Sequence, residues 1–223
     1  NQSVLDIGCG WGGMAAHIYK KSDANVVGVT LSEEQIAYAE QRKIREKLDK
    51  VEYRLQDYRN VNEKYDRIVS VGMFEHVGTA HYQEFFNKVF DLLNDNGVAL
   101  IHTIGRLNEP GTTDSWIDKY IFPGGYIPAL SETVSRVEKS GLSMTDIQIL
   151  KFHYAETLKR WRYNFYENID KVKEIYDEKF CRMWDFYLSC SQASFEEAGL
   201  VVFQLQLSKN KKTVPDKRDY LLA

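Results

Sequence analysis

The chain has 223 residues, of which 43% are hydrophobic and 27% charged, as in an ordinary globular protein, so a disordered or fibrous chain is excluded. Lys and Arg number 29 against 32 Asp and Glu, and this balance gives no overall basic charge that would indicate a nucleic-acid partner. No apolar run approaches the roughly 20 residues of a membrane span, and three cysteines without CxxC spacing are typical of a cytoplasmic protein.

The first half of the chain alternates short apolar runs with helical patterns. We predict strands at residues 4–7, 25–30, 51–55, 65–71 and 98–103, and helices that end near residues 21, 48 and 93. Ser32 and Gln35 have the spacing of a capping box, and Asn94 to Gly97 is expected to end the third helix. Strands that alternate with helices predict a parallel sheet, so the fold class is α/β, doubly wound.

The second half has a different pattern. Residues 104–130 hold three of the four prolines and are expected to form a long loop or lid. A helix is predicted at 130–140, a strand at 143–150, two aromatic-rich helices within 154–198, and a last strand at 200–207. We predict one domain over residues 1–223. Because a strand begins within three residues of the first position and no methionine precedes it, we expect the sequence to start inside a longer protein.

The segment from Asp6 to Gly12 is a strand end followed by Gly-x-Gly-x-Gly and a helix, which is typical of a nucleotide-type site. Glycines allow a ligand to approach the backbone closely. The segment is neither GxGxxG nor a phosphate loop ending in GK[ST], so phosphate is less favoured. Asp6 would repel phosphate and would suit a cationic ligand such as S-adenosylmethionine, which carries a sulfonium and an ammonium. A tight turn that binds nothing is the alternative.

The segment VLDIGCGWGG (4–13) resembles motif one of the class I S-adenosylmethionine-dependent methyltransferases. The second strand ends at Thr30 without the ribose-binding acid of most such enzymes, a departure that is similar to the cyclopropane fatty acid and mycolic acid cyclopropane synthases. The resemblance is closest to the bacterial enzymes that modify phospholipids. It covers nearly the whole chain, through VVGVTLSEEQ (26–35), LQDYR (55–59), YDRIVSVGMFEHVG (65–78), LIHTIG (100–105), WIDKYIFPGGYIP (116–128), HYAETL (153–158) and RMWDFYLSC (182–190).

This resemblance implies a Rossmann-like, seven-stranded sheet whose last strand is antiparallel, with residues 104–130 and 152–198 covering the substrate. The implied reaction transfers the methyl group of S-adenosylmethionine to a cis double bond of a phospholipid acyl chain. The resulting carbocation must be kept from water, and a bound bicarbonate removes a proton to close a cyclopropane ring. By motif match, its ligands are the side chain of Glu75, His102, the backbone of Ile104, and Tyr154. A family cysteine upstream of motif one has no counterpart here.

The resemblance also implies a set of cofactor contacts and no metal. The glycines pass under the methionine part, the end of the second strand meets the ribose and adenine, and the remaining residues flank the cofactor. These contacts are Asp6, Gly8, Gly10, Thr30, Leu31, Gln35, Gln56, Asp57, Val71 and His76. Simpler interpretations stay open: Gln35 only completes the capping box, His102 is a core histidine, and Tyr154 packs at a helix start.

An acyl chain in a bilayer requires peripheral contact with the inner face of the membrane. Lipid-contact candidates in the proline-rich loop are Tyr120, Ile121, Phe122 and Tyr126. The basic tail could add contact with anionic lipid, at about 1 kcal/mol per Lys or Arg, or could simply be solvated. Its members are Lys209, Lys211, Lys212, Lys217 and Arg218. A homodimer is left open.

Three other functions compete with this interpretation. Methyltransferases that act on small amines share the fold but need neither bicarbonate nor a long apolar tunnel. Relatives that make a methyl-branched or hydroxylated chain intercept the same cation. A fragment that binds lipid or cofactor without catalysis is the third alternative.

Overall fold

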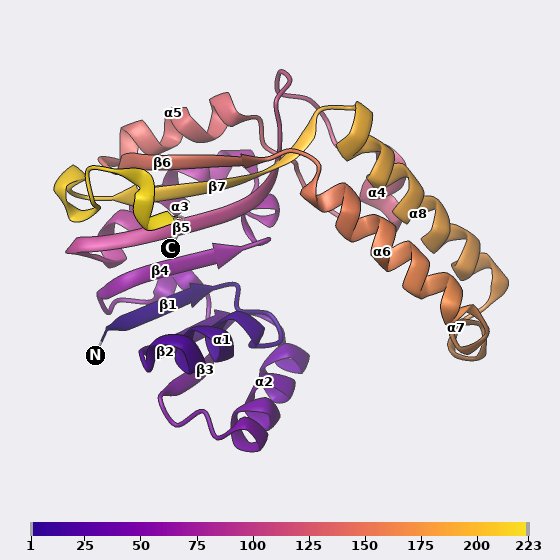
Figure 1. Cartoon of the computed structure of the whole chain (residues 1–223), viewed down its shortest axis with the longest axis horizontal. Helices are drawn as coiled ribbons and strands as arrows, with labels where there is room; N and C mark the ends of the chain where they lie inside the picture. Colours follow the sequence, from indigo (N-terminus) through magenta and orange to yellow (C-terminus); the bar gives the residue numbers. More distant parts are fainter. Residues whose placement is uncertain (1, 222–223) are drawn as a thin grey trace. The chain divides into compact units, whose positions relative to one another are not determined.

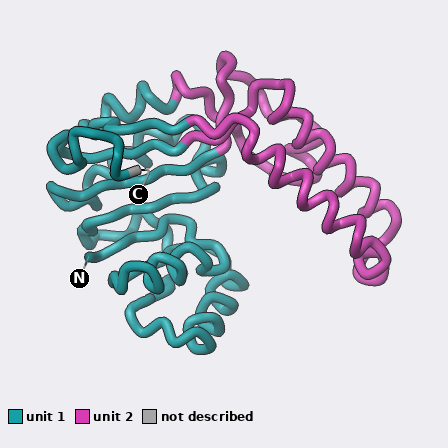
Figure 2. The backbone as a smooth tube through the Cα atoms, viewed as in Figure 1, with its two compact units in different colours: residues 1–103, 133–148, 204–223 teal, residues 104–132, 149–203 magenta. Residues whose placement is uncertain are grey.

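The computed structural model describes residues 2–221. The chain forms two compact units, shown in Figure 2. The first consists of residues 1–103, 133–148 and 204–223, and the second of residues 104–132 and 149–203. The second unit therefore contains both segments, 104–130 and 152–198, that we expected to cover a substrate. Their contact with a substrate stays a prediction.

Within residues 2–221, seven strands form one mixed sheet in the order β3-β2-β1-β4-β5-β7-β6 (Figure 1). Strands β1 to β5 pair in parallel, and the last strand along the chain, β7, is antiparallel. The predicted fold class and the antiparallel last strand are confirmed. The strands are β1 (Ser3–Ile7), β2 (Asn25–Thr30), β3 (Val51–Leu55), β4 (Tyr65–Val71), β5 (Leu93–Arg106), β6 (Ser143–Leu150) and β7 (Leu200–Ser208).

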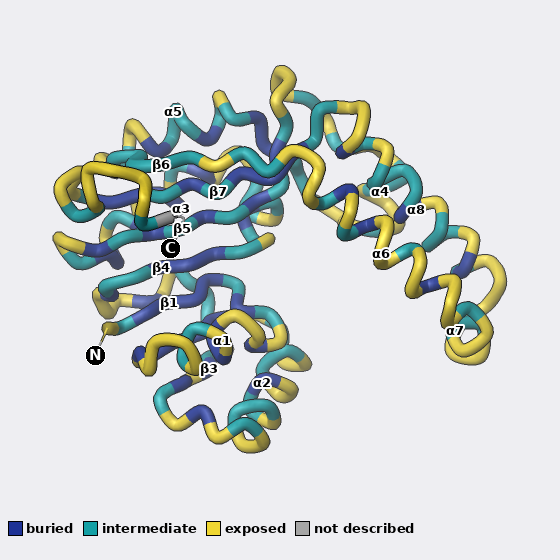
Figure 3. The backbone as a smooth tube through the Cα atoms, viewed as in Figure 1, coloured by how far each residue is buried: buried dark blue, intermediate teal, exposed yellow. Residues whose placement is uncertain are grey.

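The helices beside the first strands are those that the sequence pattern predicts. Figure 3 shows buried residues concentrated along the strands. The apolar stripe of α3 is fully buried, with Phe85, Phe86 and Val89 at 0% exposure. Ser32 caps α2, since its hydroxyl accepts a hydrogen bond from the Gln35 N–H at 3.2 Å. The helices are α1 (Gly13–Ser22), α2 (Glu33–Glu46), α3 (Tyr82–Leu92) and α5 (Leu130–Ser140), with short 3-10 turns η1 (Tyr58–Asn60), η2 (Phe74–His76), η3 (Thr79–His81), η4 (Lys211–Thr213) and η5 (Arg218–Leu221).

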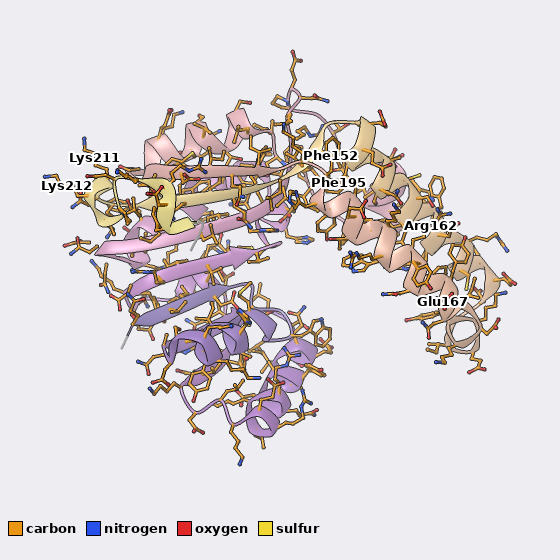
Figure 4. The ribbon with its side chains drawn as sticks, in the orientation of Figure 1. Phe152, Arg162, Glu167, Phe195, Lys211 and Lys212 are labelled. Carbon is orange, nitrogen blue, oxygen red and sulfur yellow. The ribbon has the colours of Figure 1, made fainter. Side chains whose placement is uncertain are left out.

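The second unit is mainly helical. Its helices are α4 (Ser115–Tyr120), α6 (His153–Glu167), α7 (Ile169–Ile175) and α8 (Glu178–Glu197). Helices α6 and α8 lie side by side (Figure 1) and pack around Leu158, Leu188 and Phe195. An ion pair of 2.7 Å joins Asp185 of α8 to Arg162 of α6, which is labelled in Figure 4. Two sequence predictions are wrong here. Residues 153–197 form three helices rather than two, and the expected loop 104–130 contains α4.

The bounds predicted for the fifth strand are also wrong. Strand β5 begins at Leu93, not Val98, and continues to Arg106. The predicted stop from Asn94 to Gly97 forms a bulge within the strand, because Tyr65 pairs with Leu93 while Arg67 pairs with Val98. The Asn94 amide donates to Asp66 Oδ1 at 2.8 Å and holds this bulge against β4.

No helix within residues 2–221 is long and apolar enough to cross a membrane.

Candidate cofactor and active site

The glycine turn between β1 and α1 is built from left-handed backbone. Gly8, Gly10 and Gly12 have φ values of 76°, 54° and 76°. The backbone N–H groups of Gly8 and Cys9 both donate to the carbonyl of Val29 at 3.0 Å, which fixes the turn to the end of β2. A Cβ at Gly8 would lie 2.6 Å from Cγ of Met73. A side chain is therefore excluded there by strain and by contact.

The middle of this turn is open. No atom lies within 4 Å of the place where a Cβ of Gly10 would stand. Beneath it, Asp6 is only 1% exposed, and its carboxylate accepts a hydrogen bond from the Ala15 N–H of α1. Its Oδ2 atom has no hydrogen-bond partner within the described part of the chain, and burial raises the pKa of Asp6 to about 7. A buried carboxylate oxygen in need of a partner fits a cationic ligand.

Cys9 takes no part in this chemistry. Burial raises the pKa of its thiol to about 12, so the reactive thiolate is disfavoured. The sulfur packs where a Cβ of Gly28 would stand, at 3.0 Å. Cys9 therefore acts as a small residue that fills space within the turn.

The end of β2 gathers four of the predicted cofactor residues. The Thr30 hydroxyl donates to Gln35 Oε1 at 2.6 Å, and the Thr30 carbonyl accepts from the Gln56 N–H at 3.0 Å. Gln35 therefore turns its side chain toward Thr30 at the strand end, while only its backbone serves the Ser32 cap. Leu31 is 71% exposed at this edge.

Asp57, the next predicted contact, already has a partner. Its carboxylate forms a two-pronged interaction with the guanidinium of Arg59, at 2.6 to 3.1 Å. These hydrogen bonds lower the pKa of Asp57. Sequence spacing gave no sign of this ion pair, and contact of Asp57 with a cofactor stays a prediction.

The strand register brings one residue of the predicted base site, His102, to the sheet edge that carries the glycine turn. Ile7 pairs with Ser70, and Ser70 with Ile101, so the residues that follow lie level along the carboxyl edge of the sheet. Val71 pairs with His102. Since neighbouring strands are about 4.8 Å apart, His102 stands about 10 Å from β1. The sheet thus brings Val71 and His102 to the edge that carries the turn.

Glu75 and His76 lie in η2, directly after β4. Phe74 anchors this turn, since it is fully buried and stacks on Tyr82 with ring centroids 4.2 Å apart. Glu75 Oε2 is shielded from solvent, whereas His76 is exposed. The two residues therefore have different environments, and a role of Glu75 in holding a ligand stays a prediction.

His102 is half-buried, and burial lowers the pKa of its imidazole, which favours the neutral ring. Its Nδ1 atom lies 3.1 Å from Nε2 of Gln204 on β7. Gln204 lies in none of the motifs that predict the site. The available signal was a polar residue within the otherwise apolar run Leu200 to Leu205.

The remaining two predicted ligands belong to the second unit. Tyr154 lies in the first turn of α6 and packs its ring against Phe195 and Trp161, with centroids 5.0 and 5.9 Å away. Ile104 contributes to the same helical core. Within this unit, Tyr154 therefore packs among aromatic side chains at a helix start, as the simpler interpretation expected. Its role as a bicarbonate ligand together with Glu75 and His102 stays a prediction.

The predicted lipid contacts differ in exposure. Tyr120 and Phe122 are 50% and 43% exposed. Ile121 packs against the helical core, and the Tyr126 hydroxyl donates to the Glu132 carboxylate at 2.9 Å. Only the first two therefore offer large apolar surfaces.

Two residues of the basic tail, Lys209 and Arg218, bind to other parts of the first unit. Lys209 Nζ donates to the carbonyl of Leu93 at 2.7 Å, and Arg218 pairs with Asp146 at 3.0 Å. The side chains that remain exposed include Lys211 and Lys212, which are labelled in Figure 4. No group of three or more metal-ligating side chains occurs within residues 2–221.

The family model described as mycolic acid cyclopropane synthetase matches residues 1–205. The chain belongs to this family. Members are S-adenosylmethionine-dependent methyltransferases, so the family resemblance noted in the sequence is confirmed.

Curated relatives of this family support the same assignment. The chain is 40% identical to the cyclopropane-fatty-acyl-phospholipid synthase of Escherichia coli and 36% identical to a probable fatty acid methyltransferase of Pseudomonas putida. These alignments cover 92% and 91% of the chain and 53% of each relative. The chain thus spans about half the length of these curated relatives.

Solved structures of the family share the fold. The cyclopropane synthase MmaA2 from Mycobacterium tuberculosis superimposes with a TM-score of 0.86 and 32% identity, over 94% of this chain and 78% of that one. The mycolic acid cyclopropane synthase CmaA1, solved with S-adenosylhomocysteine and CTAB, gives 0.85 and 31% identity over 93% and 78%.

Proposed function

We propose that this chain is the catalytic part of a cyclopropane-fatty-acyl-phospholipid synthase. It would transfer the methyl group of S-adenosylmethionine to a cis double bond of a phospholipid acyl chain and close a cyclopropane ring. The observation that carries the proposal is the pairing, on one sheet edge, of a glycine turn open at Gly10 with the half-buried, neutral His102. Similarity to the E. coli synthase supports the choice of substrate.

The glycine turn fits the cofactor. Gly8 and Gly10 leave backbone accessible, and Asp6 supplies a buried carboxylate that lacks a second partner for its Oδ2 within the described residues. At the neighbouring strand end, Thr30 and Gln35 present a hydroxyl and an amide that could bind ribose or adenine. S-adenosylmethionine would supply an electrophilic methyl group at this edge, and these residues bind and orient it.

The base site requires a different chemistry. An alkene is a weak nucleophile, and methyl transfer leaves a carbocation that water would quench. Bicarbonate, held by Glu75, His102, Ile104 and Tyr154, would accept the proton whose loss closes the ring. Because Glu75 and bicarbonate are both anions, one of them must carry or share a proton when they are adjacent. A neutral His102 can donate one hydrogen bond without adding charge.

Access to a lipid substrate requires contact with the membrane surface. We propose peripheral contact with the cytoplasmic face of a membrane through exposed aromatic side chains of the second unit, of which Tyr120 and Phe122 are the best placed by exposure. Exposed lysines of the tail would add attraction to anionic lipid. A homodimer is compatible with this arrangement but is not required by it.

A methyl-branched product is a second candidate. Two relatives are named as methyltransferases of fatty acids and not as cyclopropane synthases: the probable fatty acid methyltransferase of P. putida and the tuberculostearic acid methyltransferase of M. tuberculosis. The second is 37% identical to this chain, over 92% of this chain and 49% of that relative. The cation formed by methyl transfer is common to the cyclopropane and the methyl-branched product. The two products differ in the reaction that this cation undergoes next.

The test incubates the full-length protein with S-adenosylmethionine, bicarbonate and vesicles of a cis-unsaturated phospholipid, and then analyses the acyl chains. Mass spectrometry should find chains heavier by one methylene. Since a ring and an exocyclic methylene have the same mass, proton NMR must show the high-field hydrogens of a cyclopropane. A methylene or methyl branch would favour the second candidate. Unchanged lipid with bound cofactor would favour a small-amine acceptor instead.

A further inference from the structure

Gln204 and His102 face each other across two neighbouring strands. On β5, His102 lies between Ile101 and Thr103, both at 0% exposure, and on β7 the neighbours of Gln204 are equally buried. Side chains alternate along a strand, so both half-buried residues emerge on the face opposite to their buried neighbours. Their contact is therefore fixed by the packing of the two strands.

The chemistry of this contact decides where the imidazole proton lies. Nε2 of Gln204 is 3.1 Å from Nδ1 of His102. An amide –NH2 group can only donate, so in this orientation of the Gln204 amide Nδ1 accepts and carries no proton. Burial favours the neutral ring. A neutral imidazole with a bare Nδ1 carries its proton on Nε2.

We propose that Gln204 is a positioning residue that holds His102 in the Nε2–H tautomer, so that Nε2 donates to the anionic base of the cyclopropanation reaction. This inference rests on the proposed function. In the opposite tautomer, Nε2 would present a lone pair to an anion and would repel it. The proton lost by the substrate goes to bicarbonate, and the Nε2 proton of His102 stays in place throughout.

The chain offers a matched control two residues away. Gln206 lies on the same strand and the same face as Gln204, but its Oε1 accepts from the Thr145 and Tyr220 hydroxyls, at 2.9 and 2.8 Å. Gln206→Leu therefore removes the same side-chain amide from the same strand without removing a partner of His102.

Nitrogen NMR of the protein labelled with ¹⁵N-histidine reads the tautomer directly. The five histidines can be distinguished with a His102→Gln variant. We expect a bare Nδ1 and a protonated Nε2 in the native protein and in Gln206→Leu, and signals averaged between both tautomers in Gln204→Leu. Gln204→Glu, whose carboxylate only accepts, should draw the proton to Nδ1. A protonated Nδ1 in the native protein, or an unchanged His102 spectrum in Gln204→Leu, would overturn the proposal.

Turnover provides the second readout. Gln204→Leu should lower kcat about tenfold, as loss of a partner that orients a functional histidine does, with the KM for S-adenosylmethionine unchanged. Gln206→Leu should keep the native kcat, and equal kcat values for the two variants would contradict the proposal. If the native protein makes no cyclopropane, the proposed function fails, while the NMR spectra still decide the tautomer. Should Gln204→Leu not fold, the nearly isosteric Gln204→Glu carries both measurements.

Discussion

The glycine turn of the first unit and the helices of the second differ in what they present at their surfaces. The turn uses backbone, with three left-handed glycines and one buried carboxylate, Asp6. The helices α6 to α8 and the residues beside them use side chains, and many of these remain exposed at the surface. The large aromatic ones are Phe152, Trp161, Tyr163, Tyr166, Tyr176 and Phe186.

This difference predicts how each region responds to change. A backbone site depends on a few positions where only glycine can adopt the geometry, so one substitution removes the whole function. An apolar surface is shared among many side chains, and each contributes a fraction of the buried area. We therefore expect large effects in the turn and small, additive effects among the exposed aromatic residues.

The largest effect is expected at Gly10. Gly10→Val would place a branched side chain in the open space above the turn and force a β-branched residue into φ 54°. We expect loss of S-adenosylmethionine binding in calorimetry. Gly124→Val is the matched control, because Gly124 has φ 72° and is equally free of contacts within 4 Å, but lies in the second unit. Retained binding in Gly10→Val would contradict the cofactor site.

The next largest effect separates chemistry from binding. Glu75→Gln should lower kcat by roughly 100- to 1000-fold, as loss of a group that positions a catalytic base does, while the affinity for S-adenosylmethionine changes little. Glu84→Gln, which removes an exposed carboxylate that pairs with His81, serves as the control. Native turnover in Glu75→Gln would exclude Glu75 from the base site.

The first unit was the more predictable one. Strands β1 to β4 and their helices follow from local apolar spacing and caps, and motif one identified the turn. The bulge at Asn94 was missed because its partner, Asp66, lies 28 residues earlier and is recognisable only in the folded sheet. The sequence could have revealed α4, since Asp114 is an N-cap that accepts from the Trp116 and Ile117 N–H groups.

The geometry of the candidate site was predictable at positions where the type of residue restricts what it can do. Asp6 and the glycines are such positions, whereas the partner of Asp57 is not, because any nearby cation could have filled that place. Gln204 was missed for the same reason. The role of Gln204 depends on its contact with His102, which lies on a neighbouring strand and 102 residues earlier in the sequence.

The pH dependence of stability and of cofactor affinity tests the Asp6 carboxylate, which precedes the glycine turn. Burial raises the pKa of Asp6 to about 7, so the ligand-free fold binds a proton that the unfolded chain releases near pH 4. Its stability should therefore fall as the pH rises through this window. A cationic ligand favours the ionised form, so its affinity should rise about tenfold per pH unit up to pH 7 and then level off. Calorimetry across pH 5 to 8 measures this, and an Asp6→Asn variant that keeps the same slope would assign it to another group.

The smallest effect concerns the aromatic residues of the second unit. Phe122→Asp removes an apolar ring that is 43% exposed and adds a negative charge, so vesicle association should weaken about tenfold or less, since one side chain is worth roughly 1 to 2 kcal/mol. Ile44→Asp is the control, because Ile44 is an exposed apolar residue of α2 in the first unit. Sedimentation with anionic liposomes compares the two variants. If Ile44→Asp weakens association as much as Phe122→Asp, added negative charge alone explains the loss, and lipid contact is not a property of the second unit.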